Sequence, residues 1–282
     1  MNNQAVYERI TGEILKKLRS GVIPWKASWK GVGIPRNGIS KKPYRGVNIL
    51  MLAMEQYDSP LWLTYKQARE LGGSVITGEK GTPVIFWKWI EKSDEETKEI
   101  KKVPVLKNYT VFNALQCEGL TIEHSGKGLT GISSCEAIIA EYLKREDDIS
   151  LSHQKSYPFY APATDTVNIP RMSQFHTQED FYHTLFHELV HSTGHQKRLD
   201  RGLLQPSGFG SKEYSKEELV AELGASFLSG IAGIENNTIE DSAGYIKGWI
   251  AALENDTRLL IQAGAQAQKA VDYIQGIVPE TA

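Results

Sequence analysis

The segment His187-Glu188-Leu189-Val190-His191 carries the residue types of a single-metal hydrolytic site. Histidines four positions apart share one face of a helix, and two imidazoles one turn apart can both reach a Zn²⁺ ion at about 2.0–2.1 Å. Glu188 lies slightly further round the helix, where its carboxylate can reach a water on the metal. Zinc lowers the pKa of such a water to about 7, so Glu188 could take its proton and pass it to a leaving amine. The motif therefore predicts peptide hydrolysis with Glu188 as the catalytic base.

Two further histidines lie near the motif, but their positions argue against metal binding. His183 shares the helix face of the motif, yet Thr184 follows it instead of a glutamate, so we expect it to pack or to support the site from behind the ligands. Metzincins take a third histidine three residues after their glycine, and Lys197 occupies that position here. His195 follows Gly194 directly, and we interpret it as fixing the helix end, with metal binding as the alternative.

Gluzincin sites instead take a glutamate from a later helix, often with an acidic or amide residue four positions on that orients a histidine. Glu218 and Glu222 have this spacing. We predict Glu218 as the third ligand and Glu222 as a carboxylate that holds an imidazole N–H, with the reverse assignment as the alternative. Glu217 is expected to be a solvated surface residue. For Tyr245, a core or surface position is favoured over donation to an oxyanion.

These ligands indicate one divalent metal ion. Three protein ligands leave a fourth position for water, as in catalytic zinc sites. Zinc is favoured, and manganese is the alternative because imidazole and carboxylate ligands accept several divalent ions. A metal with a structural role and no turnover remains open as the alternative to catalysis.

The elements that must position the motif are helical. Thr177 and Asp180 have the spacing of a capping box, so the motif helix should begin near Gln178 and run to Gly194. Two short strands within 157–170 should precede it. Further helices are predicted over 136–144, 217–231, 242–260 and 265–275.

The first half of the chain mixes helices and strands. Apolar residues four apart predict a helix over 4–19, and further helices are expected over 47–56 and 64–71. Residues 82–90 and 103–112 are rich in β-branched and aromatic residues and predict strands, whereas 24–45 indicates an extended loop. Residues 122–134 resemble a linker. The sequence thus predicts an α+β protein with a small α+β domain over 1–121 and a mainly helical, zincin-like domain over 135–282.

The charged residues are unevenly distributed between the two halves, on either side of residue 121. Residues 1–121 hold 19 Lys and Arg against 12 Asp and Glu, whereas the remainder holds 13 against 22. A basic half suggests a polyanion partner. The two cysteines, Cys117 and Cys135, provide no disulfide framework, and no segment approaches 18 consecutive apolar residues. We therefore expect a soluble cytoplasmic protein with no membrane partner.

Two segments, 24–30 and 41–48, interleave aromatic rings with Lys and Arg. Single-stranded nucleic acid is bound in this way, with bases stacked on rings and cations along the phosphates. The candidate DNA-binding residues are Trp25, Lys26, Trp29, Lys30, Lys41, Lys42, Tyr44, Arg45 and Asn48. The alternative for Trp25 and Trp29 is a pair that pins an irregular loop. Trp62, Trp87 and Trp89 are interpreted as core residues.

Several short motifs together resemble the ArdC family of antirestriction proteins. In the first half they are GVIPW at 21–25, YRGVN at 44–48, WLTYKQA at 62–68, GEKGT at 78–82 and VFN at 111–113. In the second half they are HELVHSTGH at 187–195 and EELVAELGA at 217–225. The resemblance covers nearly the whole chain. It implies a single-stranded-DNA-binding domain, also found in certain plasmid primases, fused to a metallopeptidase-like domain and carried by conjugative elements.

The function implied by this resemblance is protection of incoming conjugative DNA from host restriction, with single-stranded DNA and a host restriction component or other protein substrate as partners. Two alternatives stay open. One is an intracellular zinc metallopeptidase whose basic domain recruits protein, and the other is a DNA-binding protector whose metal is structural.

Overall fold

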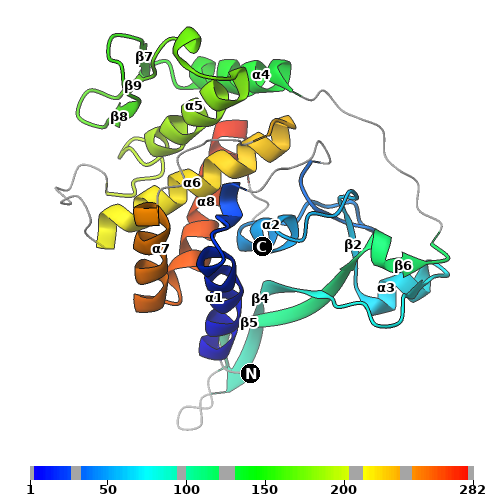
Figure 1. Cartoon of the computed structure of the whole chain (residues 1–282). Helices are drawn as coiled ribbons and strands as arrows, with labels where there is room; N and C mark the ends of the chain where they lie inside the picture. Colours follow the sequence, from blue (N-terminus) through cyan, green and yellow to red (C-terminus); the bar gives the residue numbers. More distant parts are fainter. Residues whose placement is uncertain are drawn as a thin grey trace.

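The structure, a computed structural model, describes residues 3–26, 33–93, 100–120, 131–202, 212–235 and 243–278. It combines a helical body with a long, curved β-hairpin on one side (Figure 1). Among the helices of these residues, none has the length and apolar character needed to cross a bilayer. The predicted α+β class is confirmed.

The N-terminal half begins with α1 (Asn3–Arg19), which buries Val6, Ile10, Ile14 and Leu18 along one face, as predicted for 4–19. After the short turn η1 (Pro24–Lys26) come α2 (Val47–Ala53) and α3 (Tyr65–Glu70). The Thr64 side chain and Gln67 form a capping box that starts α3.

A four-stranded sheet supports these helices, in the order β1 (Arg36–Asn37), β2 (Leu61–Leu63), β5 (Ile100–Asn113) and β4 (Thr82–Ser93). Within this sheet, β1 and β2 are the one parallel pair. A second sheet pairs β3 (Ser74–Val75) with β6 (Cys117–Glu118), which follows the turn η2 (Ala114–Gln116). Strands β4 and β5 pair from Thr82↔Val111 to Ser93↔Ile100, so the hairpin extends beyond the predicted strands.

The C-terminal half contains the helices α4 (Ile132–Arg145), α5 (Gln178–Ser192), α6 (Lys212–Ala232), α7 (Ala243–Asn255) and α8 (Leu259–Gln275). A small sheet orders its strands as β7 (Ser150–Ser152), β9 (Thr166–Asn168) and β8 (Phe159–Ala161), and η3 (Met172–Gln174) leads into α5. The two strands predicted within 157–170 are present, but β7 was not foreseen. The two helices predicted over 242–260 and 265–275 are present as α7 and α8, but the break between them falls at 256–258, earlier than predicted.

One apolar core joins the two halves. Helix α1 packs on α7, and α2 packs on α8, which in turn lies against α5 and α6 (Figure 1). The two halves approach each other closely at Gly264, where an added Cβ would lie 2.9 Å from the Val47 nitrogen. Gly46, with φ 58°, starts α2 at this contact. Residues 121–130, most of the predicted linker, lie outside the described residues, so the domain boundary stays a prediction.

Candidate metal centre

Helix α5 presents the motif as its sequence predicts. The Thr177 side chain accepts a hydrogen bond of 3.0 Å from the Asp180 nitrogen and caps the first turn. The helix ends at Ser192, and its neighbour α6 runs alongside it. A Cβ on Gly224 of α6 would lie 2.7 Å from Cγ2 of Val190 on α5, so this glycine sets how closely the two helices pack.

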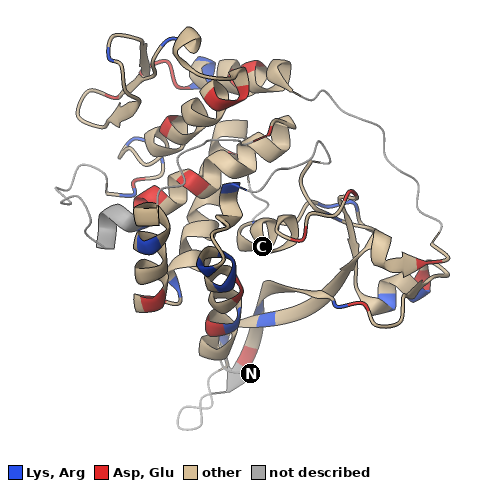
Figure 2. Cartoon of the chain, in the orientation of Figure 1, with Lys and Arg blue, Asp and Glu red and all other residues tan. Residues whose placement is uncertain are grey.

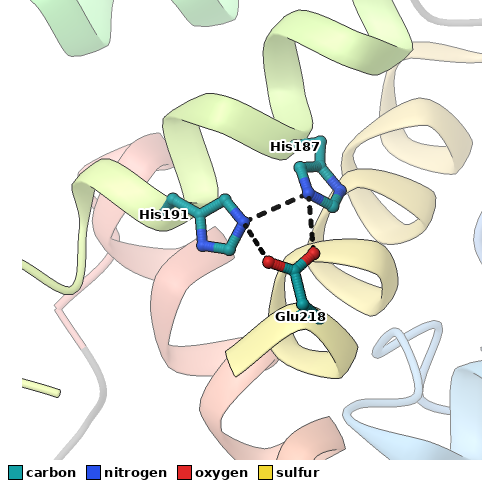
Figure 3. Close-up of side chains that lie close together, drawn as sticks. All are labelled: His187, His191 and Glu218. Carbon is teal, nitrogen blue, oxygen red and sulfur yellow. Dashed lines mark hydrogen bonds and ion pairs between the residues drawn. The ribbon is translucent and has the colours of Figure 1, made fainter. Parts of the chain in front are cut away.

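Three side chains from these two helices converge on one point (Figure 3). Candidate ligand atoms of His187, His191 and Glu218 all lie within 4.8 Å of one another. The two Nε2 atoms are 3.1 Å apart, and the Glu218 oxygens lie 3.6 Å from His187 Nε2 and 3.7 Å from His191 Nε2. Two imidazole nitrogens and a carboxylate are a donor set that suits zinc or manganese.

The electrostatics of this cluster favour a cation. Burial alone would lower the pKa of His187, but the hydrogen bond with Glu218 and the charges of Glu222 and Glu188 raise it to about 9. The site therefore stabilises a positive charge between its acidic residues, which a divalent ion would supply in place of a proton.

Glu217 is not the solvated surface residue that we expected. Its Oε1 accepts hydrogen bonds from His191 Nδ1 at 3.1 Å and from Arg201 Nη2 at 2.7 Å, and its Oε2 accepts one from Arg201 Nε at 2.9 Å. Burial would raise the pKa of Glu217, but the hydrogen bonds from Arg201 and His191 lower it. A proton on His191 Nδ1 leaves the Nε2 lone pair facing the cluster.

Arg201 holds this carboxylate in place from the loop after α5. Its guanidinium also donates to the Val190 carbonyl oxygen at 2.8 Å and to the Thr193 hydroxyl at 2.7 Å. Nothing in the sequence pattern pointed to Arg201, because its contact with Glu217 depends on how the loop folds back over the helix end.

Glu222 lies near the cluster but makes a different contact from the predicted one. Its Oε1 accepts a 2.7 Å hydrogen bond from the Tyr245 hydroxyl rather than from an imidazole. Trp25 donates from Nε1 to the same hydroxyl oxygen at 3.2 Å. Burial first, and the Glu222 charge second, raise the pKa of Tyr245. The N-terminal half thus reaches the surroundings of the metal centre through Trp25.

Glu188 lies buried beside the cluster, on the side of strand β8. Burial raises its pKa, although the nearby imidazoles of His187 and His191 and a hydrogen bond from the Tyr160 backbone lower it. A carboxylate in this environment binds a proton more readily than a solvated one.

His183 and His195 lie outside the three-residue cluster, as expected. The Nδ1 of His183 lies 3.0 Å from the Ser229 hydroxyl, and burial, His187 and Lys26 lower the pKa of its ring to about 3. His195 is buried, and its Nδ1 accepts a hydrogen bond of 3.2 Å from the Lys197 backbone, which closes the turn after α5.

Three of the residues predicted to contact DNA are buried. Trp25 and Tyr44 are buried, and Trp25 packs edge-on against Trp249, so the loop-pinning alternative holds for Trp25. Asn48 is buried as well, and its amide exchanges two hydrogen bonds with the backbone of Ile85. Their burial argues against the DNA contacts predicted for Trp25, Tyr44 and Asn48.

The remaining candidate DNA-binding residues differ in their surroundings. Lys26 lies over the Tyr245 ring, with Nζ 5.3 Å from its centroid, and Arg45 forms an ion pair with the buried Asp272. Lys41 and Lys42 are exposed. Trp29 and Lys30 lie outside the described residues.

The tryptophans interpreted as core are not all buried. Trp62 is buried as predicted, but Trp87 and Trp89 on β4 are 49% and 60% exposed, so that interpretation is wrong for both. They lie where the hairpin extends beyond the four-stranded sheet, on the face that is still buried at Ile85 and Leu106.

Known proteins resemble this chain along nearly its whole length. Residues 4–112 match the N-terminal domain of the anti-restriction factor ArdC, and residues 139–266 match a zincin-like metallopeptidase family. The crystal structure of the ArdC protein of plasmid R388 in its metal-free form has a TM-score of 0.79 and 36% sequence identity, covering 95% of this chain and 96% of that one. The chain belongs to the ArdC family of antirestriction proteins. The resemblance expected from the short motifs is thereby confirmed.

A second structure of the R388 protein and two further proteins are similar to this chain. The Mn(II)-bound form of the R388 ArdC protein matches with a TM-score of 0.77. The protein y4eC of Sinorhizobium fredii is 33% identical, over 95% of this chain and 91% of its own length. A DNA primase TraC of Escherichia coli is 34% identical over 95% of this chain, but the match spans only 27% of the primase. This ArdC-family chain thus corresponds to about a quarter of the curated primase.

Proposed function

We propose that this ArdC-family protein binds single-stranded DNA and hydrolyses a peptide bond at a metal centre formed by His187, His191 and Glu218. The observation that carries the second part is the convergence of three ligand atoms from two helices, with Glu217 directing the His191 lone pair toward the same point. Glu218 rather than Glu222 is the third ligand, because Glu222 is engaged by Tyr245.

The residues fit one divalent ion, with zinc or manganese as the candidates, and the Mn(II)-bound relative supports the same class. When bound, such an ion polarises the scissile carbonyl and lowers the pKa of a water. Glu188 accepts a proton from the attacking water, and its buried position beside the cluster suits this role. As the carbon–nitrogen bond breaks, Glu188 gives that proton to the leaving amine.

The biological role that we infer is protection of conjugative DNA from restriction in the cytoplasm of the recipient cell. It is supported by membership of the ArdC family and by the likeness to a DNA primase. The excess of Lys and Arg in residues 1–121, 19 against 12 Asp and Glu, suits a polyanionic partner. A host restriction component, or another protein bound near the DNA, is the proposed peptide substrate.

Glu188→Gln tests whether hydrolysis belongs to this role. The substitution keeps the shape of the side chain but removes its proton-accepting charge, so metal content and thermal stability should match the wild type. Protection should fall to the level of cells that lack the protein, measured as conjugation into restricting relative to non-restricting recipients. Glu141→Gln, the same change at an exposed position on α4, is the matched control and should protect fully.

Full protection by Glu188→Gln would refute the hydrolytic part of the proposal and favour a structural metal. If the wild-type protein itself gives no protection, the antirestriction role is wrong.

A further inference from the structure

The β4–β5 hairpin has two faces of different chemistry. Side chains alternate along a strand, and the uninterrupted register places Phe86 opposite Lys107 and Val84 opposite Tyr109. Phe86 and Lys88 of β4 therefore share one face with Lys107 and Tyr109 of β5. We call these four residues the lysine face. Trp87 and Trp89 lie on the opposite face of the same hairpin.

The two rings of the lysine face are accessible and held in place. Phe86 and Tyr109 are each 46% exposed, and their centroids are 5.7 Å apart in an edge-to-face arrangement. Tyr44 lies against Phe86 with centroids 6.3 Å apart, and Tyr44 is itself buried. A ring that is half exposed and fixed by a buried neighbour loses little conformational entropy when a flat group stacks on it.

The charges of the two faces point to different partners. On the lysine face, Lys88 and Lys107 are exposed, and no acidic side chain of the described residues shares this face or pairs with either lysine. The opposite face carries Glu91 opposite Lys102, one charge of each sign, beside the two exposed tryptophans. In Figure 2 the ribbon of the hairpin shows basic and acidic segments separated by uncharged residues.

Flat apolar rings interleaved with lysines that pair with no acidic side chain in the described part of the chain are complementary to a strand of unstacked bases on a phosphate backbone. A duplex offers the same phosphates, but its bases are already stacked on one another and cannot reach the rings. The lysine face therefore fits single-stranded nucleic acid better than duplex.

We propose that single-stranded DNA binds across the lysine face, with bases stacked on Phe86 and Tyr109 and phosphates on Lys88 and Lys107. This inference rests on the single-stranded-DNA binding proposed above and assigns it to residues. It moves the stacking role from Trp25 and Tyr44, which are buried, to rings that the sequence pattern did not single out.

The test uses the full chain in fluorescence polarisation with a labelled single-stranded oligothymidine and a duplex of equal length. Phe86→Ala with Tyr109→Ala should weaken single-strand binding by about tenfold per ring and leave duplex binding nearly unchanged. Trp87→Ala with Trp89→Ala removes two exposed rings from the opposite face and is the matched control. Its single-strand affinity should stay within about twofold of the wild type.

A second variant guards against loss of folding in the first. Lys88→Ala with Lys107→Ala changes only exposed side chains, so the thermal melt should be that of the wild type. If both lysines contact phosphates, the slope of log Kd against log salt for the single strand should fall by about 1.4.

The outcomes separate the two proposals. If the wild type shows no single-strand binding at moderate salt, the proposed DNA-binding function fails. If the wild type binds but the Phe86 and Tyr109 variant binds equally well, or the Trp87 and Trp89 variant loses as much affinity, the assignment to the lysine face is overturned. An unchanged salt slope in the lysine variant would also overturn it.

Discussion

Glu217→Gln is the substitution that most directly tests how the metal centre is held. In the wild type, three N–H donors point at two carboxylate oxygens: His191 Nδ1 and Arg201 Nη2 at Oε1, and Arg201 Nε at Oε2. Glutamine keeps one acceptor oxygen and replaces the other with an NH₂ group, which is a donor. If the NH₂ group replaces Oε2, Arg201 Nε loses its acceptor, and if it replaces Oε1, both His191 Nδ1 and Arg201 Nη2 lose theirs.

The two amide orientations predict the same direction of change. If the NH₂ group replaces Oε2 and faces Arg201 alone, the guanidinium loses the charge-assisted hydrogen bond from Nε and its counter-charge. If it faces His191, the ring must accept at Nδ1 and carry its proton on Nε2, the atom that we propose as the ligand. Either way a metal binds less tightly, because His191 is less well oriented or must first lose a proton.

The expected loss of metal affinity is about 10- to 100-fold, the usual effect of removing a carboxylate that orients a metal-binding histidine. That corresponds to about 1.4–2.7 kcal/mol. The metal-free protein should also lose about 3 kcal/mol of unfolding free energy, because Arg201, whose side chain is 7% exposed, is left without its partner charge.

Metal affinity is measured by competition with a chromophoric chelator, well below the melting temperature of the variant. Glu218→Gln should lose more affinity than Glu217→Gln, because it alters a proposed ligand itself. Glu141→Gln, at an exposed site on α4, should lose none. A folded Glu217→Gln protein whose affinity stays within twofold of the wild type would refute this reasoning.

Two further substitutions test the frame around the site. Gly224→Ala would place a Cβ 2.7 Å from the buried Val190 side chain. We therefore expect a loss of about 1–3 kcal/mol in unfolding free energy and weaker metal binding in calorimetric titration. Gly248→Ala, whose added Cβ would meet no atom within 4 Å, is the control and should cause neither change. Asp165→Asn weakens the ion pair to the buried Arg198 and should cost about 3 kcal/mol at neutral pH in denaturant titrations. Burial would raise the pKa of Asp165, but hydrogen bonds led by that from Arg198 lower it below 3.8, so its contribution is present above about pH 4 and is lost on acidification. The stability difference between wild type and Asp165→Asn should therefore shrink as the pH falls below 4; a constant difference would contradict the assignment.

The metal centre could be predicted largely from sequence because its geometry is local. Helical spacing alone places His187 and His191 one turn apart, and a second helix needs to supply only one carboxylate. Glu217 was misjudged because its role depends on Arg201, which reaches it from a loop whose path no periodicity records. The sequence shows that Glu217 and Glu218 point in different directions around their helix. It does not show that Glu217 faces the Arg201 cation.

The aromatic residues were harder to assign for the opposite reason. A strand pattern shows that Trp87 and Trp89 share a face with each other, but not where the supporting sheet ends. Because the hairpin continues beyond the sheet, the face that buries Ile85 and Leu106 becomes exposed at Trp87 and Trp89, and aromatic content no longer signals burial. Trp25 was predicted to be available for stacking but is buried. The ring that packs against it, Trp249, lies on a helix far along the chain.

Contacts between the two halves connect the lysine face to the helices that form the metal centre. Tyr44 supports Phe86, and the next residue, Arg45, pairs with the buried Asp272 of α8, where Gln268 also accepts from the Gly46 nitrogen. Helix α8 packs against both α5 and α6, the helices that carry the proposed ligands. Since these contacts are buried or close-packed, the hairpin base cannot move independently of the metal-binding helices without breaking core contacts. DNA bound on the hairpin would therefore hold a fixed position relative to the centre that we propose for peptide hydrolysis.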